Sequence, residues 1–142
     1  MNRILKMLSV TTCMLLAGQA LSGVAARAAE LLVFERDGCP SCIIFEHEVG
    51  RIYGNTKEAK VAPLKRINIK SIPDAYRHVG GIVYTPTFVL VDDARHVVGR
   101  IEGYPGFDFF WERLDMLLDK LKAHKATKAA HEPPSSHAVN EG

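Results

Sequence analysis

Asp37-Gly38-Cys39-Pro40-Ser41-Cys42 stands between the apolar run Leu31-Leu32-Val33-Phe34 and a segment with helical periodicity. Two cysteines separated by two residues close a disulfide with almost no backbone movement. At the start of a helix, the first thiol also meets unpaired backbone N–H groups and the positive end of the helix dipole. Both favour the thiolate, which is the reactive form of cysteine. The stretch therefore predicts a thiol–disulfide redox site.

The segment after the first cysteine has the pattern of an amphipathic helix. Apolar side chains recur at three- and four-residue steps, at Cys42, Phe45, Val49, Ile52 and Tyr53. Pro40 suits the first helical turn, where its missing N–H costs nothing. Cys42 lies on the apolar stripe and is expected to be buried, whereas Cys39 is expected to be exposed at the helix entrance near Arg36. His47 lies two turns beyond Cys39, too far along the helix to act as its base.

The remaining elements follow in the order β-α-β-α-β-β-α. Short apolar or β-branched runs bounded by turns predict strands at residues 31–35, 64–69, 87–91 and 97–101. Helices are predicted at 40–53, 73–78 and 107–122, with a polar connection at 57–63. A strand, crossover and strand imply a parallel pair, and the hairpin then adds two antiparallel strands. We expect an α/β fold in which a mixed four-stranded sheet carries helices on both faces.

Three segments are predicted along the chain. Residues 1–28 have the pattern of a secretory signal peptide: Arg3 and Lys6 precede an apolar run, and Ala26 and Ala28 stand where a signal peptidase reads small residues. The apolar run is shorter than the roughly 20 residues of a membrane-spanning helix, although an uncleaved anchor is the alternative. Residues 29–122 form the predicted domain. Residues 123–142 hold a single bulky aliphatic side chain, Val139, and are expected to be disordered.

Charge and cysteine content narrow the class of protein. The chain has 18 Lys and Arg against 16 Asp and Glu, and removal of the signal peptide leaves 15 against 16, a net charge of −1. No basic patch predicts nucleic-acid binding or stable attachment to a membrane. Only Cys39 and Cys42 remain after cleavage, in an exported protein where disulfides persist. Because a disulfide scaffold needs more cysteines, the domain must be stabilised by a hydrophobic core.

Residues 31–121 resemble the thioredoxin-like superfamily in a minimal, glutaredoxin-sized form. The resemblance rests on Cys39-Pro40-Ser41-Cys42 after a strand, Thr85-Pro86 before the third strand, and the closing hairpin and helix. It implies that Cys39 attacks the target disulfide, that Cys42 resolves the mixed disulfide, and that Pro40 and Ser41 border the substrate. It also implies that Thr85-Pro86 is a cis peptide facing the cysteines, with the Thr85 backbone binding an extended substrate. Without this resemblance, the Thr85-Pro86 bond would be expected to be trans, because only about 5–6% of X–Pro bonds in folded proteins are cis.

The sequence departs from thioredoxin beside the cysteines, and other uses of the cysteine pair stay open. Val33 stands where thioredoxin has a buried acid, and Glu35 is the candidate substitute. One alternative is a stabilising disulfide. Another is a cuprous-ion-binding thioredoxin-like module, since two thiolates suffice for that ion. A third is a binding protein that keeps the fold and only presents its surface.

The signal peptide, the run from Phe34 to Cys42 and the compact core resemble the small periplasmic thioredoxin-like proteins encoded beside sulfur-oxidation (Sox) genes. That resemblance implies a reductant that keeps a sulfur-carrier cysteine active. We therefore predict an exported, periplasmic thiol–disulfide oxidoreductase that needs no cofactor. Its partners would be proteins with cysteines or disulfides and an upstream electron donor, and we expect a monomer.

Overall fold

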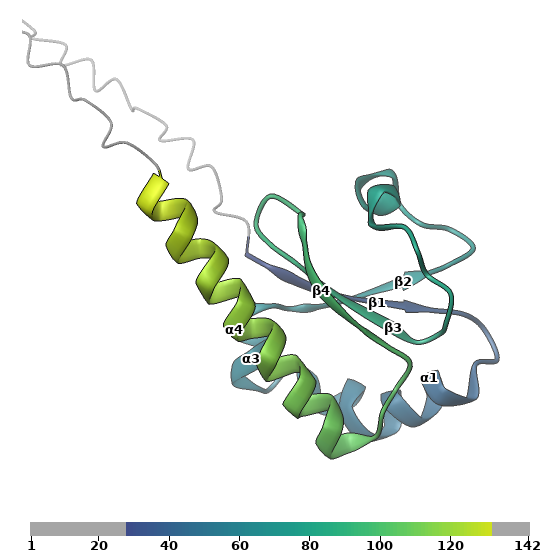
Figure 1. The fold of residues 1–142 in the computed structure, drawn as a ribbon. Helices are drawn as coiled ribbons and strands as arrows, with labels where there is room; N and C mark the ends of the chain where they lie inside the picture. The colour runs from purple at the N-terminus through teal and green to yellow at the C-terminus, as the bar shows by residue number, and fades with distance from the viewer. Residues whose placement is uncertain (1–27, 132–142) are drawn as a thin grey trace, which may run out of the picture.

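Four strands form one mixed sheet in the order β2-β1-β3-β4 (Figure 1). The computed structural model describes residues 28–131, so most of the predicted signal peptide and residues 132–142 of the predicted tail lie outside it. The strands are β1 (Glu30–Glu35), β2 (Leu64–Asn68), β3 (Thr87–Val91) and β4 (Val97–Glu102). β2 runs parallel to β1, and β3 is antiparallel to both β1 and β4. The predicted α/β class and the predicted order of elements are confirmed.

The two central strands are buried on both faces of the sheet. Side chains alternate along a strand, so Leu31 and Val33 of β1 join one apolar cluster and Leu32 and Phe34 join the other. All five residues of β3 are buried. This places the carboxyl end of β1, which leads into the cysteines, against the amino end of β3, where Phe34 pairs with Thr87.

One face of the sheet is covered by α1 (Pro40–Phe45), α3 (Lys57–Val61) and α4 (Phe107–His131), as Figure 1 shows. Three aromatic rings attach α1 and α4 to this face. The ring centroid of Phe45 lies 4.6 Å from that of Phe88 on β3 and 5.6 Å from that of Phe110 on α4. Such edge-on and tilted arrangements suit the charge distribution of aromatic rings. The helix that carries Cys42 is therefore held by the centre of the core.

The opposite face of the sheet is covered by a single turn-rich segment, η2 (Asp74–Val79), which is a 3₁₀ helix. Tyr76 and Val79 pack there on Leu32 and Phe34. The predicted helix at residues 73–78 thus exists in the tighter 3₁₀ form. Helices lie on both faces of the sheet, as predicted.

The helix after the cysteines contains a π-helical turn that the sequence analysis did not predict. α1 continues into η1 (Glu46–Gly50), which is π-helical, and then into α2 (Arg51–Tyr53). Phe45, Val49 and Tyr53 are spaced four residues apart and are all fully buried. Residues four apart lie on one helix face, so these three side chains pack together on the core across the π turn.

The last helix extends further along the chain than predicted. α4 ends at His131, whereas it was predicted to end at residue 122 with disorder beginning at 123. Residues 123–131 are exposed and pack on no core, but they consist largely of alanine and lysine, which favour helix, and the first proline comes at Pro133. Adding residues to an existing helix needs no new nucleation step, so helix formers extend it without tertiary support.

Within residues 28–131, no helix is both long enough and apolar enough to cross a membrane.

Candidate active site

Cys39 and Cys42 form a disulfide at the start of α1. Cys39 is the N-cap residue, and its Sγ accepts a hydrogen bond from the backbone N–H of Cys42 at 3.2 Å. Pro40 occupies the first turn, as predicted. Gly38, just before the pair, has a φ of 68°, a left-handed conformation that favours glycine. The turn therefore delivers the first sulfur directly to the free N–H groups of the helix.

Thr85 and Pro86 lie against this sulfur from the other side. The peptide bond between them is cis, as the family resemblance implied. The Sγ of Cys39 lies 3.3 Å from the carbonyl oxygen of Thr85, although the two residues are 46 apart in sequence. Arg36 closes the arrangement, since its Nε donates a hydrogen bond to Thr85 Oγ1 at 3.2 Å. The structure thus brings together the two segments that the sequence analysis singled out.

Cys42 is buried, as predicted, but the exposure predicted for Cys39 is wrong. Cys39 is 3% exposed and Cys42 is 7% exposed, so the first cysteine is not the more accessible one in the disulfide form. Cys39 is covered because the Thr85 carbonyl lies on one side of its sulfur and Cys42 on the other. Pro40 and Ser41, between the cysteines, are exposed.

A depression of about 440 Å³ lies beside the disulfide. Both cysteines line it, together with charged and apolar side chains from β1, β2 and the helix: Glu35, Arg36, Ile43, Glu46, His47, Arg51 and Arg66. The sequence analysis missed Arg51 and Arg66, and it considered His47 only as a base for Cys39, for which it lies too far along the helix. Ile43, His47 and Arg51 follow one another at four-residue steps, a spacing that places side chains on one helix face and that could have identified them from the sequence.

Glu35 and Glu46 share one cation in this depression. Arg66 on β2 pairs with Glu35 at 3.3 Å, and its other terminal nitrogen pairs with Glu46. Glu35 therefore points to the helix-bearing face, the same face as Val33, rather than away from the site. It is the carboxylate of β1 that the depression brings into the neighbourhood of Cys42.

Tyr104, in the loop before α4, contacts the helical segment that follows the cysteines. Its hydroxyl donates a hydrogen bond to Glu48 at 2.6 Å. Burial, and then this bond to a carboxylate, raise the pKa of Tyr104 above its ordinary value, so the hydroxyl stays protonated and remains a donor. The hydrogen bond thus links η1 to the loop before α4.

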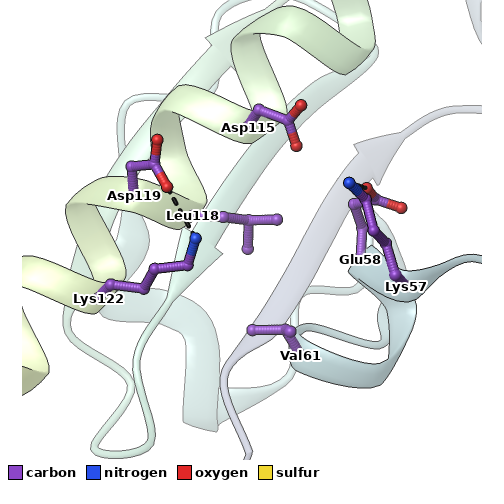
Figure 2. A pocket seen from close by; sticks show the side chains of 7 residues that line it. All are labelled: Lys57, Glu58, Val61, Asp115, Leu118, Asp119 and Lys122. Carbon is purple, nitrogen blue, oxygen red and sulfur yellow. Dashed lines mark hydrogen bonds and ion pairs between the residues drawn. The ribbon is translucent and has the colours of Figure 1, made fainter.

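A second cavity, of about 340 Å³, lies between α3 and α4, far from any thiol (Figure 2). Its wall is charged: Lys57 lies 3.6 Å from Glu58, and Lys122 lies 2.9 Å from Asp119. Asp115 also faces it. Both lysines are thus paired with carboxylates, and no cysteine is among the residues that line this cavity.

No group of three or more His, Cys, Asp or Glu side chains that could hold a metal ion was found in residues 28–131. The two sulfurs are instead bonded to each other. What the site offers chemically is a disulfide that exchanges two electrons with a partner's thiols.

Comparison with solved structures places this geometry in a family. The periplasmic thioredoxin SoxS from Paracoccus pantotrophus, in its reduced form, is 36% identical to the chain, over 65% of this chain and 97% of SoxS, with a TM-score of 0.58. The chain belongs to the thioredoxin-like family. The fold of this family and the Cys39–Cys42 disulfide make it a thiol–disulfide oxidoreductase similar to SoxS.

More distant thioredoxins share the fold of this thioredoxin-like chain. A thioredoxin from Thermus thermophilus is 23% identical over 69% of this chain and 79% of its own, with a TM-score of 0.53. A thioredoxin from Malassezia sympodialis is 14% identical over 64% of this chain and 77% of its own, with a TM-score of 0.52. No protein-family model and no curated protein matches the sequence.

Proposed function

We propose that the chain is exported to the periplasm and there reduces a disulfide, or another oxidised cysteine, of a partner protein. The contact of Cys39 with both the helix N-terminus and the Thr85 carbonyl carries the exchange chemistry in this proposal, and its reducing direction rests on the similarity to SoxS. The predicted signal peptide and the similarity to a periplasmic thioredoxin support the compartment. The partner class is a protein with an accessible functional cysteine, and a sulfur-carrier protein is the first candidate.

The reduced protein would act in two exchange steps. The Cys39 thiolate attacks one sulfur of the partner disulfide, the partner S–S bond breaks, and the leaving sulfur takes the electron pair and then a proton. The Cys42 thiolate next attacks Sγ of Cys39, the mixed disulfide breaks, and the second partner thiol is released. The Cys39–Cys42 disulfide forms, two electrons have passed to the partner, and an upstream thiol donor restores the dithiol.

Each site residue has a role in these steps. The Cys42 N–H and the positive end of α1 stabilise the Cys39 thiolate. Thr85 offers a backbone carbonyl beside the reacting sulfur, where an extended partner segment can lie next to Pro86. Pro40 and Ser41 form the exposed edge over which the partner approaches.

Trapping of mixed disulfides tests this proposal. With Cys42→Ser, Cys39 still attacks but nothing nearby releases the intermediate, so partner proteins should accumulate as covalent complexes that a small thiol dissolves. The measurement is non-reducing electrophoresis and mass spectrometry of complexes captured in the periplasm of the producing cell. The matched control is Cys39→Ser, which should trap few partners because the remaining Cys42 thiolate lacks the N-cap position and the backbone N–H bond that stabilise a thiolate at Cys39.

Equal trapping by the two variants would contradict the roles of the cysteines. If neither variant trapped any protein and the wild-type dithiol bound cuprous ion stoichiometrically without exchanging disulfides, the copper-binding function would replace this one.

A further inference from the structure

The depression beside the disulfide carries an excess of positive charge. Among the side chains that line it are three guanidinium groups, those of Arg36, Arg51 and Arg66, and one imidazole, that of His47, against two carboxylates. Both carboxylates belong to the ion pairs of Arg66. Within residues 28–131, no ion pair is found for Arg36 or Arg51. The surface beside the cysteines is therefore left with two cations that a bound partner can neutralise.

These cations lie along the path that a substrate takes. Arg36 adjoins the Thr85 platform, since its Nε donates to Thr85 Oγ1, and no ion pair involves its terminal nitrogens in the part of the chain that the structure describes. Arg51 lies further along the helix, on the side of the depression reached through the π turn. Ile43, which is 65% exposed, lies in the same depression and offers an apolar contact.

We propose that this basic depression binds acidic side chains that neighbour the reactive cysteine of the substrate protein. The inference rests on the proposed function and narrows its substrate class to cysteines flanked by Asp or Glu. A carboxylate suits the planar, forked guanidinium group of arginine, which can donate two parallel hydrogen bonds to it. Such a contact positions the partner and speeds its approach without changing the chemistry at the sulfurs.

The test uses peptides that differ only in charge. Three peptides carry one cysteine capped with an uncharged thiopyridyl group, and the residues next to this cysteine are Glu, Gln or Lys. Reduced protein attacks the peptide sulfur, the thiopyridyl thiol leaves and is measured by its absorbance, and Cys42 then releases the peptide thiol. The protein dithiol supplies both electrons, so a single turnover needs no other reductant.

The wild type should react with the Glu peptide about three- to fivefold faster than with the Gln peptide, and more slowly still with the Lys peptide, as surface charge pairs of ordinary strength allow. Salt near 1 M should remove most of the difference, because it screens exposed charges. Arg51→Glu should reverse the order of the Glu and Lys peptides. Lys125→Glu makes the same change of charge near the C-terminal end of α4 and should keep the wild-type order.

Equal rates for the three peptides in the wild type, or an unchanged order in Arg51→Glu, would overturn the inference while leaving the proposed function intact. Reversal by Lys125→Glu as strong as that by Arg51→Glu would also overturn it, because the effect would then come from net charge. If the wild type reduced none of the peptides, the proposed function itself would be wrong, and this inference with it.

Discussion

At the scale of single residues, Cys39 and Cys42 differ in what surrounds their sulfurs rather than in how much of each is exposed. Both side chains are nearly buried, but only Cys39 caps the helix and accepts the Cys42 N–H. A thiolate at Cys39 meets the positive end of the helix, whereas a thiolate at Cys42 would lie inside it, near the shared carboxylates of the depression. The difference in reactivity between the two thiols should therefore follow the electrostatic environment of each sulfur rather than its exposure to solvent.

This difference is measurable in the reduced protein. At about pH 6, where an unperturbed thiol is protonated, Cys39 should react with iodoacetamide at least about tenfold faster than Cys42, because its thiolate is the more stable one. Timed alkylation followed by peptide mass spectrometry separates the two sites. Unfolding in urea should abolish the difference, and equal rates in the folded protein would contradict the assigned roles.

At the scale of elements, the hairpin between β3 and β4 depends on one carboxylate. Asp92 accepts hydrogen bonds from the backbone N–H groups of Ala94 at 2.9 Å and His96 at 2.7 Å. Burial alone would raise the pKa of Asp92, but the hydrogen bonds and charge of His96 outweigh it and hold this pKa below its ordinary value of 3.8. The ionised form is thus the one that the folded hairpin stabilises.

Asp92→Ala should lower the free energy of unfolding by about 1–2 kcal/mol at neutral pH, the cost of leaving such N–H groups without their charged acceptor. A folded-state pKa below the unfolded one means that the stabilisation is present above the unfolded pKa and is lost as pH falls through the folded one. The difference between variant and wild type should therefore shrink below about pH 3.8. Urea denaturation at several pH values measures it. Asp93→Ala, whose carboxylate accepts no hydrogen bond within residues 28–131, is the matched control.

At the scale of the whole molecule, two apolar clusters on the two faces of the sheet provide the stability, and the disulfide adds little. The bond closes a loop of two residues between Cys39 and Cys42. Loop-closure entropy for so short a loop amounts to about 2 kcal/mol at most. The core contains Phe45, Phe88 and Phe110, none of which depends on the bond.

Reduction should therefore leave the chain folded, with a free energy of unfolding within about 2 kcal/mol of that of the oxidised form. Urea denaturation with and without a thiol reductant measures both values. This difference in the free energy of unfolding also enters the reduction potential of the cysteine pair, because about 1.4 kcal/mol corresponds to 30 mV for such a pair. Unfolding on reduction would instead assign the disulfide a structural role.

The sequence alone determined the class of fold and the position of the chemistry. Both are written in local patterns: alternating or continuous apolar runs predict strands, and the spacing after Pro40 predicts a helix with Cys39 at its entrance. Thr85-Pro86 was identified through family resemblance, because nothing in its own neighbourhood distinguishes it from an ordinary proline turn. The end of α4 was misjudged because an apolar face was required for a helix that alanine and lysine extend without one.

Only the tertiary structure decided what surrounds the sulfurs. The burial of Cys39 depends on the carbonyl of Thr85, and Arg66 reaches the site from β2, both through chain segments distant in sequence. Arg51 lines the same depression beyond a π-helical turn that the sequence analysis did not predict. Periodicity describes one segment at a time, whereas a site is formed where several segments pack, and the free energy of that packing is what selects its geometry.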